Sequence, residues 1–198
     1  MAAQRRPSAV AAAASPALLC AGLTLAVALR AGIAAGPDTL AAATAFSVAL
    51  VALAVAAGWR PGRPSLRSAL IGAGGAALLL AGPFLAHMRA LPLQAGSPPG
   101  DLAAWAIVVT LVACAEEALL RGALMDELMR RGRVRPEVAA VVAALAFAAL
   151  HVPLYGWGAV PLDFGVGVWL GGLRLWSGGA GAPALAHTLA DVASWWLR

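Results

Sequence analysis

Lysine is missing from this sequence, and charged residues of any kind are few. All 14 basic residues are arginine, 12% of the 198 residues are charged, and 62% are hydrophobic. A soluble domain of this size could not bury so much apolar surface, so the composition excludes an ordinary soluble globular protein. Arginine without lysine, together with abundant alanine and glycine, indicates a GC-rich bacterial coding bias.

Cysteine is also scarce, and this excludes a fold held together by disulfides. Cys20 and Cys114 both lie in apolar segments, where a disulfide framework is not expected. Cys114 stands two residues before Glu116, a position that suggests a thiol nucleophile. We prefer the interpretation that Cys114 is a small packed side chain.

Nucleic acid is excluded as a partner despite the net charge of +5. The arginines lie in short loops between apolar runs, and no basic face carries interleaved aromatic residues. In such loops arginine sets the orientation of membrane spans and contacts anionic lipid. We therefore expect the lipid bilayer to be a partner.

What the chain does have is a series of long apolar runs. A helix needs about 20 apolar residues to cross a bilayer, and several runs reach this length. The first run could be a signal peptide or a lipoprotein signal that ends at Cys20. Because the run continues well past this cysteine and the leucine before it fits a lipoprotein cleavage site poorly, we interpret the run as a span. We predict an all-α, polytopic transmembrane helix bundle with about seven spans, which forms one membrane domain over residues 1–198. The predicted spans are 9–29, 39–59, 68–88, 101–131, 136–151, 160–176 and 184–197, and Asp101 is the predicted N-cap of the fourth.

The arginines predict the orientation of this bundle. With the N-terminus in the cytoplasm, ten arginines fall in inner segments, and only Arg30, Arg89 and Arg198 fall in outer ones. We therefore predict an integral protein of the bacterial inner (plasma) membrane with a cytoplasmic N-terminus. The seventh span is short and the sixth contains Asp163, so the count could differ by one. The inner arginines are Arg5, Arg6, Arg60, Arg63, Arg67, Arg130, Arg131, Arg133, Arg135 and Arg174.

A few ionisable residues remain inside the predicted spans. Glu116, Glu117 and Arg121 interrupt an apolar run that extends from 102 to 125. Ionisable groups at membrane depth are costly, so they indicate a functional site. Glu117 and Arg121 stand four residues apart and can form an ion pair on one helix face. Glu116 is rotated by about 100° from its neighbour and can face the bundle interior.

Two histidines on later spans complete the set. Phe147 and His151 share one face of the fifth span, and His187 and Asp191 share one face of the seventh. This combination permits water activation, in which a carboxylate acts as general base, one histidine holds the water and the other stabilises an oxyanion. Glu116, His151 and His187 could equally bind Zn²⁺, although their order does not match the His-Glu-x-x-His signature.

Each polar pair also has a purely structural interpretation. Glu117 and Arg121 alone would be an ion pair that holds a helix, and His151 alone would be a capping or interfacial residue. His187 and Asp191 alone would be a buried hydrogen-bonded pair. Three such pairs in so apolar a chain are costly to keep for structure only, which favours a function. We expect Asp163 at the edge of a loop rather than in this cavity.

The three motifs, in this order on separate membrane helices, resemble the CPBP family. This family comprises the CAAX prenyl protease-like and bacteriocin-processing intramembrane proteases, also called the ABI family. The motifs are Glu-Glu-x-x-x-Arg at 116–121, Phe-x-x-x-His at 147–151 and His-x-x-x-Asp at 187–191. The resemblance covers a predicted catalytic core at 102–194. Residues 1–100 match only as generic spans and are predicted to be accessory.

The resemblance implies an intramembrane endopeptidase and a role for each motif residue. His151 would share the water with Glu116, and Phe147 is assigned to substrate binding. Members are described as glutamic-type or metallo-type proteases, so Zn²⁺ held by Glu116, His151 and His187 stays open. The other implied roles are water activation by Glu116, its support by Glu117 and Arg121, and an oxyanion site formed by His187 and Asp191.

One residue departs from the family pattern. The family often has Asn where this chain has Asp191, and an ionised Asp cannot donate a hydrogen bond to an oxyanion. Asp191 would therefore be protonated or would orient His187.

The substrate implied is a membrane-associated protein or peptide, with C-terminal processing as one concrete version. The alternative is a non-catalytic membrane immunity or scaffolding protein of the same family. A proton-coupled transporter with Glu116 and His151 as a relay is disfavoured, because the sequence shows no broken helices arranged as paired repeats.

Overall fold

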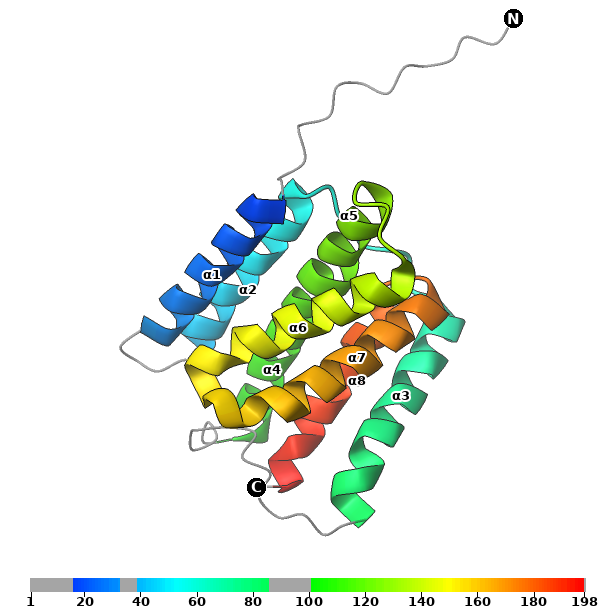
Figure 1. Ribbon diagram of the computed structural model, residues 1–198. Helices are drawn as coiled ribbons and strands as arrows, with labels where there is room; N and C mark the ends of the chain where they lie inside the picture. The colour runs from blue at the N-terminus through cyan, green and yellow to red at the C-terminus, as the bar shows by residue number, and fades with distance from the viewer. Residues whose placement is uncertain (1–15, 33–38, 86–100, 198) are drawn as a thin grey trace, which may run out of the picture.

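Every regular element of the described chain is helical, as the sequence predicts. The structure is a computed structural model that describes residues 16–32, 39–85 and 101–197 (Figure 1). The predictions for Arg5, Arg6, Arg89 and Arg198, and the cytoplasmic placement of the N-terminus, concern residues outside these ranges.

The helices follow the predicted apolar runs closely. Three helices precede the 86–100 stretch, and the others follow it. In chain order they are α1 (Pro16–Gly32), α2 (Leu40–Ala56), α3 (Leu66–Leu85), α4 (Leu102–Glu117), the π-helix η1 (Ala118–Leu124), α5 (Met125–Arg130), α6 (Pro136–Tyr155), the 3₁₀ turn η2 (Trp157–Ala159), α7 (Val160–Ser177), α8 (Gly181–Ala193) and the 3₁₀ turn η3 (Ser194–Leu197).

Local sequence signals explain where the helices begin and end. The Asp101 side chain accepts a hydrogen bond of 2.7 Å from the Ala104 amide, which confirms the predicted N-cap of α4. Pro136 occupies the first turn of α6, where its missing N–H costs nothing. Gly178 has φ of 80° and ends α7 in the left-handed conformation that glycine tolerates.

The predicted single helix at 101–131 is interrupted in its middle. Residues 118–124 form a π-helix between α4 and α5, and they include Arg121. π-helical segments are rare and often mark functional sites. Trp59 packs against this segment so closely that a Cβ on Gly122 would lie 2.3 Å from the indole nitrogen. Only glycine fits at 122 without movement of the indole.

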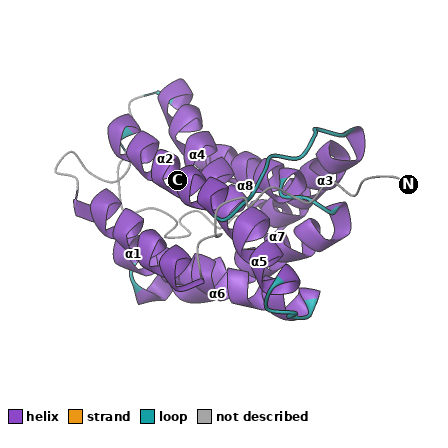
Figure 2. Cartoon of the chain, turned by 90° about the horizontal axis from the view of Figure 1, so that it is seen from above, coloured by secondary structure: helices purple, strands orange, loops and turns teal. Residues whose placement is uncertain are grey.

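α8 lies near the centre of the bundle. It packs against α3, α4 and α7, and α4 also packs against α2 (Figure 2). α6 pairs with α7, and α1 lies beside α2. This arrangement brings the motif-bearing helices α4, α6 and α8 into one region.

Small residues allow the close packing of α6 and α7. A Cβ built on Gly167 would lie 2.9 Å from the Cα of Ala144, and one on Gly171 would lie 2.9 Å from the Cβ of Ala140. Helices in lipid associate through such small residues, because van der Waals contact replaces the hydrophobic effect. Gly72 and Gly75 of α3 approach α8 and α7 in the same way.

Part of the predicted set of membrane spans is supported. Leu102–Arg130 and Pro136–Tyr155 are long and apolar enough to cross a membrane. The apolar helices Ala21–Gly32, Leu40–Ala56 and Leu66–Ala81 are shorter. Over the described residues, therefore, length and composition identify two spanning helices rather than the full set of about seven.

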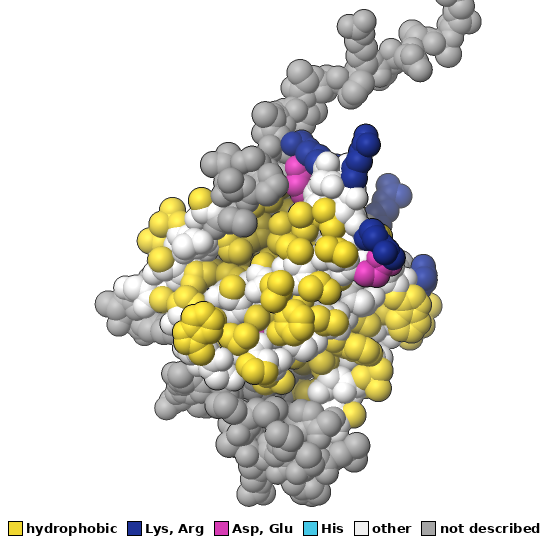
Figure 3. Space-filling view, viewed as in Figure 1, with side chains coloured by type: hydrophobic (Ala, Val, Ile, Leu, Met, Phe, Trp, Pro, Cys, Tyr) yellow, Lys and Arg dark blue, Asp and Glu magenta, His cyan; other side chains and the backbone are white. Residues whose placement is uncertain are grey.

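The surface separates apolar from basic residues. The face in Figure 3 is mostly hydrophobic, and its arginines gather at one end. The α2–α3 loop, the α5–α6 turn and the α7–α8 turn lie at this end in Figure 1. Exposed arginines lie in or beside two of these connections: Arg60, Arg63, Arg67, Arg130, Arg131, Arg133 and Arg135. All of them were predicted to share one side of the membrane.

Arg30 was predicted in an outer loop, and this was wrong. It lies in the last turn of α1 and is 5% exposed. Its guanidinium carbon is 4.8 Å from the centre of the Phe46 ring, a distance typical of a cation–π contact. Because α1 continues to Gly32, Arg30 packs inside the bundle rather than in a loop.

The glycine packing yields a test with a matched control on one helix. Gly167→Ala should lower stability by about 1–3 kcal/mol, because the new methyl group overlaps the α6 backbone. Gly172 is exposed and has no neighbour within 4 Å of a built Cβ. Gly172→Ala should be neutral or stabilising by up to about 1 kcal/mol through helix propensity. Thermal unfolding in detergent measures both, and equal shifts for the two variants would contradict the packing argument.

Candidate active site

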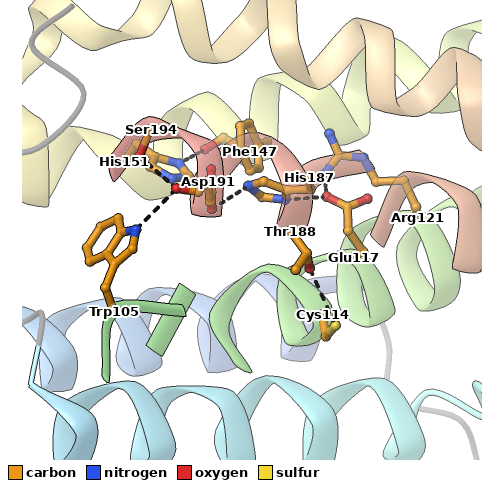
Figure 4. A network of polar contacts seen from close by, with 10 residues as sticks. All are labelled: Trp105, Cys114, Glu117, Arg121, Phe147, His151, His187, Thr188, Asp191 and Ser194. Carbon is orange, nitrogen blue, oxygen red and sulfur yellow. Dashed lines mark hydrogen bonds and ion pairs between the residues drawn. The ribbon is translucent and has the colours of Figure 1, made fainter. Parts of the chain in front are cut away.

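A buried ion pair between α4 and the π-helical segment lies at the centre of the polar network. Arg121 Nη1 donates to Glu117 Oε1 at 2.7 Å, and both side chains are fully buried (Figure 4). Arg121 Nη2 donates to the carbonyl of Gly167 on α7 at 3.0 Å. The predicted pairing of Glu117 with Arg121 is therefore confirmed, and it also ties α4 to α7.

His187 of α8 bridges two carboxylates. Its Nδ1 donates to Glu117 Oε1 at 3.0 Å, and its Nε2 lies 3.4 Å from Asp191 Oδ2. Figure 4 shows the imidazole between these two acids. The predicted pairing of His187 with Asp191 forms, and a second partner, Glu117, was not predicted. The contact to Asp191 is the longer of the two and the more easily replaced.

His151 of α6 has one nitrogen committed and one available. A carbonyl only accepts hydrogen bonds, so the 2.8 Å contact from Nδ1 to the Phe147 carbonyl assigns the proton to Nδ1. In the neutral ring, Nε2 then carries the lone pair. The ring also stacks on Tyr155, with 5.5 Å between centroids. This arrangement suits a histidine that accepts a hydrogen bond from water.

Phe147 holds the two histidines in place. Its ring centroid lies 4.5 Å from that of His151 and 5.3 Å from that of His187. The guanidinium of Arg121 lies 4.9 Å from the same centroid. Phe147 is 2% exposed. Its observed contacts are with site side chains, and substrate binding by Phe147 stays a prediction.

Glu116 points into the protein, as its rotation from Glu117 predicts. It is 2% exposed. It interacts electrostatically with His187, Arg30, Glu117 and Arg121. Arg30 is a member of this charge cluster that the sequence reasoning missed, because it was assigned to a loop. An arginine within an apolar stretch was the available signal.

Backbone contacts fix the position of Asp191. Trp105 Nε1 of α4 and Ser194 Oγ donate to the Asp191 carbonyl, at 3.2 and 2.7 Å. The Asp191 side chain is 34% exposed, whereas that of His187 is 7% exposed. The polar network therefore reaches the surface at its Asp191 end.

Cys114 lies at the seam between α4 and α8. It is exposed, and its Sγ is 3.8 Å from Thr188 Oγ1. It also lines a crevice of about 650 Å³ with the α2–α3 loop and the α7–α8 turn, whose lining contains none of the predicted catalytic residues. The prediction that Cys114 is a packed side chain was therefore wrong, because its thiol lies at the exposed edge of the α4–α8 contact.

The three predicted zinc ligands do not fit a metal site in this arrangement. Both nitrogens of His187 face carboxylate oxygens, so neither is directed at a shared metal position. Within residues 16–32, 39–85 and 101–197, no three His, Cys, Asp or Glu side chains are grouped so that they could hold an ion. Zn²⁺ binding by Glu116, His151 and His187 stays a prediction from the sequence alone.

The fold and these contacts define a class of protein: a helical bundle with an apolar surface that encloses acidic, histidine and arginine side chains. Residues 98–193 match the family model described as type II CAAX prenyl endopeptidase Rce1-like. These residues, just under half of the chain, thus match a membrane-embedded protease family, and this match confirms the resemblance to the CPBP family. Comparisons with curated proteins and with solved structures find no match.

The buried ion pair can be tested against an exposed one. Arg121→Met should destabilise the protein by about 3–5 kcal/mol, because it leaves Glu117 buried without its cation. Arg135 pairs with Glu137 at 3.7 Å, and both side chains are largely exposed. Arg135→Met should cost less than about 1 kcal/mol. Unfolding midpoints in detergent compare the two, and a similar small loss in both variants would show that Arg121 does not hold the bundle together.

Proposed function

We propose that this protein is an intramembrane endopeptidase that hydrolyses a peptide bond of a membrane-associated protein or peptide, with C-terminal processing as its specific role. The observation that carries the proposal is the His187 imidazole. It is held between Glu117 and Asp191 and contacts His151 through Phe147, within the segment that matches a protease family.

The contacts of the two glutamates support different roles. Glu117 Oε1 accepts hydrogen bonds from both Arg121 and His187, which occupies both lone pairs of that oxygen. Glu117 therefore suits the role of a holding group. Glu116 is buried and interacts electrostatically with His187. We therefore assign Glu116 as the general base.

The two histidines suit the two other tasks of water-mediated hydrolysis. Nε2 of His151 accepts a hydrogen bond from the attacking water, while Glu116 takes a proton from that water as the water oxygen bonds to the carbonyl carbon. Glu116 then gives this proton to the amide nitrogen as the C–N bond breaks. His187 donates from both nitrogens only as the imidazolium, a form that its two carboxylate partners favour. Its Nε2 then donates to the oxyanion of the tetrahedral intermediate when the substrate oxygen replaces the 3.4 Å contact with Asp191. Asp191 orients His187 before the substrate binds and does not itself donate, which accommodates Asp at this position.

The base assignment is tested by removing basicity while keeping shape. Glu116→Gln should reduce cleavage of a membrane peptide by at least about 100-fold, since general-base catalysis contributes about 10²–10⁴-fold. His187→Gln should give a comparable loss, because it removes the oxyanion donor. The assay uses purified protein in detergent, with thermal unfolding as a check on the fold.

Cys114→Ala is the matched control on α4, and it should cleave at the rate of the unmodified protein. Cleavage retained in both the Glu116 and the His187 variants would contradict the proposal. A cellular protection or assembly phenotype that survives Glu116→Gln would instead favour the immunity or scaffolding alternative. Comparing C-terminally processed membrane proteins in cells with and without Glu116→Ala would identify the substrate.

A chelation experiment tests whether cleavage requires Zn²⁺. We expect cleavage to persist after treatment with a strong chelator and gel filtration, because both nitrogens of His187 are engaged by carboxylates. Elemental analysis of the same sample gives the zinc content per chain. Activity lost with zinc and regained on its return would show that Glu116, His151 and His187 rearrange to bind the ion.

A further inference from the structure

Asp163 is a buried carboxylate that the proposed mechanism does not use. It lies in the first turn of α7, near the predicted loop edge, but it is only 8% exposed and is therefore buried. Its Oδ2 is buried and has no hydrogen-bond partner among the described residues. A buried polar atom without a partner costs about 1–3 kcal/mol, so its presence calls for an explanation.

The register of α6 and α7 places Asp163 beside the site. α6 and α7 run antiparallel, since Gly171 lies against Ala140 and Gly167 lies against Ala144. Moving four residues toward the start of α7 therefore moves four residues toward the end of α6. The next step sets Asp163 level with Ala148, one helical turn before His151. Asp163 thus occupies the α7 face that packs on α6.

The same face of α7 already contacts the polar network. Gly167, one turn after Asp163, accepts the hydrogen bond from Arg121 through its carbonyl. Gly167 shares a helix face with Asp163, since they stand four residues apart. The carboxylate therefore lies one turn from the Arg121 contact and one turn from the level of His151.

The charges around Asp163 all belong to the site. Its strongest charge interaction is with His151, and the others are with Glu116, His187 and Asp191. Conversely, Asp163 is the strongest charge partner of His151, ahead of His187 and Asp191.

We propose that Asp163 is a positioning residue of the catalytic site, whose carboxylate orients the His151 imidazole from α7. The carbonyl of Phe147 holds the ring from α6 at 2.8 Å, so the two anchors lie on different helices. Asp163 forms and breaks no bond; its negative charge keeps the ring turned so that Nε2 faces the attacking water. This inference rests on the proposed endopeptidase function.

The test is a double-mutant cycle between Asp163 and His151. Asp163→Asn should lower kcat by about 10- to 100-fold, the scale of a small misplacement of a reacting group, with KM changed by less than about threefold. If Asp163 acts through His151, the double variant with His151→Gln should be no slower than His151→Gln alone. Asp163→Glu keeps the charge and should restore most of the activity.

Asp126→Asn is the matched control. Asp126 is a partly buried acid that pairs with Arg174 at 2.6 Å, at the arginine-rich end of the bundle and outside the site. Asp126→Asn removes the same charge but should leave kcat within about twofold, and its effect should add to that of His151→Gln. Additive losses for Asp163 and His151, or a normal kcat in Asp163→Asn, would overturn the proposal.

A measurement without substrate separates this inference from the proposed function. Absence of cleavage by the unmodified protein would contradict the endopeptidase function but would leave the Asp163–His151 charge interaction untested. Thermal unfolding of the unmodified protein, Asp163→Asn, His151→Gln and the double variant should then show that the two losses of stability are not additive. Additive losses of stability would refute the positioning role. If Asp163→Asn does not fold, the cycle is run with Asp163→Ala, and an additive result there overturns the proposal equally.

Discussion

The ion pair between Glu117 and Arg121 is the interaction on which the rest of the site depends. Among the described residues, Glu117 Oε2 and Arg121 Nε have no hydrogen-bond partner. Burial of two opposite charges with no exposed surface is costly, so each side chain needs at least one further partner. Arg121 finds one in the Gly167 carbonyl and a face of the Phe147 ring, and Glu117 finds one in His187. The need to neutralise one buried charge thus sets the relative positions of α4, α6, α7 and α8.

Small side chains make this concentration of polar groups possible. Gly167 brings the α7 backbone close to α6, and its carbonyl becomes a partner for Arg121. A larger residue at 167 would hold the helices apart and leave the guanidinium without that acceptor. Lipid supplies no polar groups, so the buried charges of a membrane bundle depend on close helix packing for their hydrogen-bond partners.

The sequence predicted what depends on spacing within one helix. Glu117 with Arg121 and His187 with Asp191 follow from a separation of four residues, and the N-cap at Asp101 follows from local chemistry. It could not predict contacts that depend on how helices pack. The bridge from His187 to Glu117, the burial of Arg30 and Asp163, and the π-helix at 118–124 all require the neighbouring helices to be in place. The catalytic roles themselves stay predictions.

The contact between Trp59 and Gly122 has a consequence for how this chain can vary. Trp59 follows α2, in the half predicted to be accessory, and its indole occupies the space that any side chain at 122 would need. A bulkier residue at 122 is tolerable only together with a smaller one at 59. The two halves are therefore expected to covary at these positions among relatives, and a chimera that joins unrelated halves would have to inherit both partners from one parent.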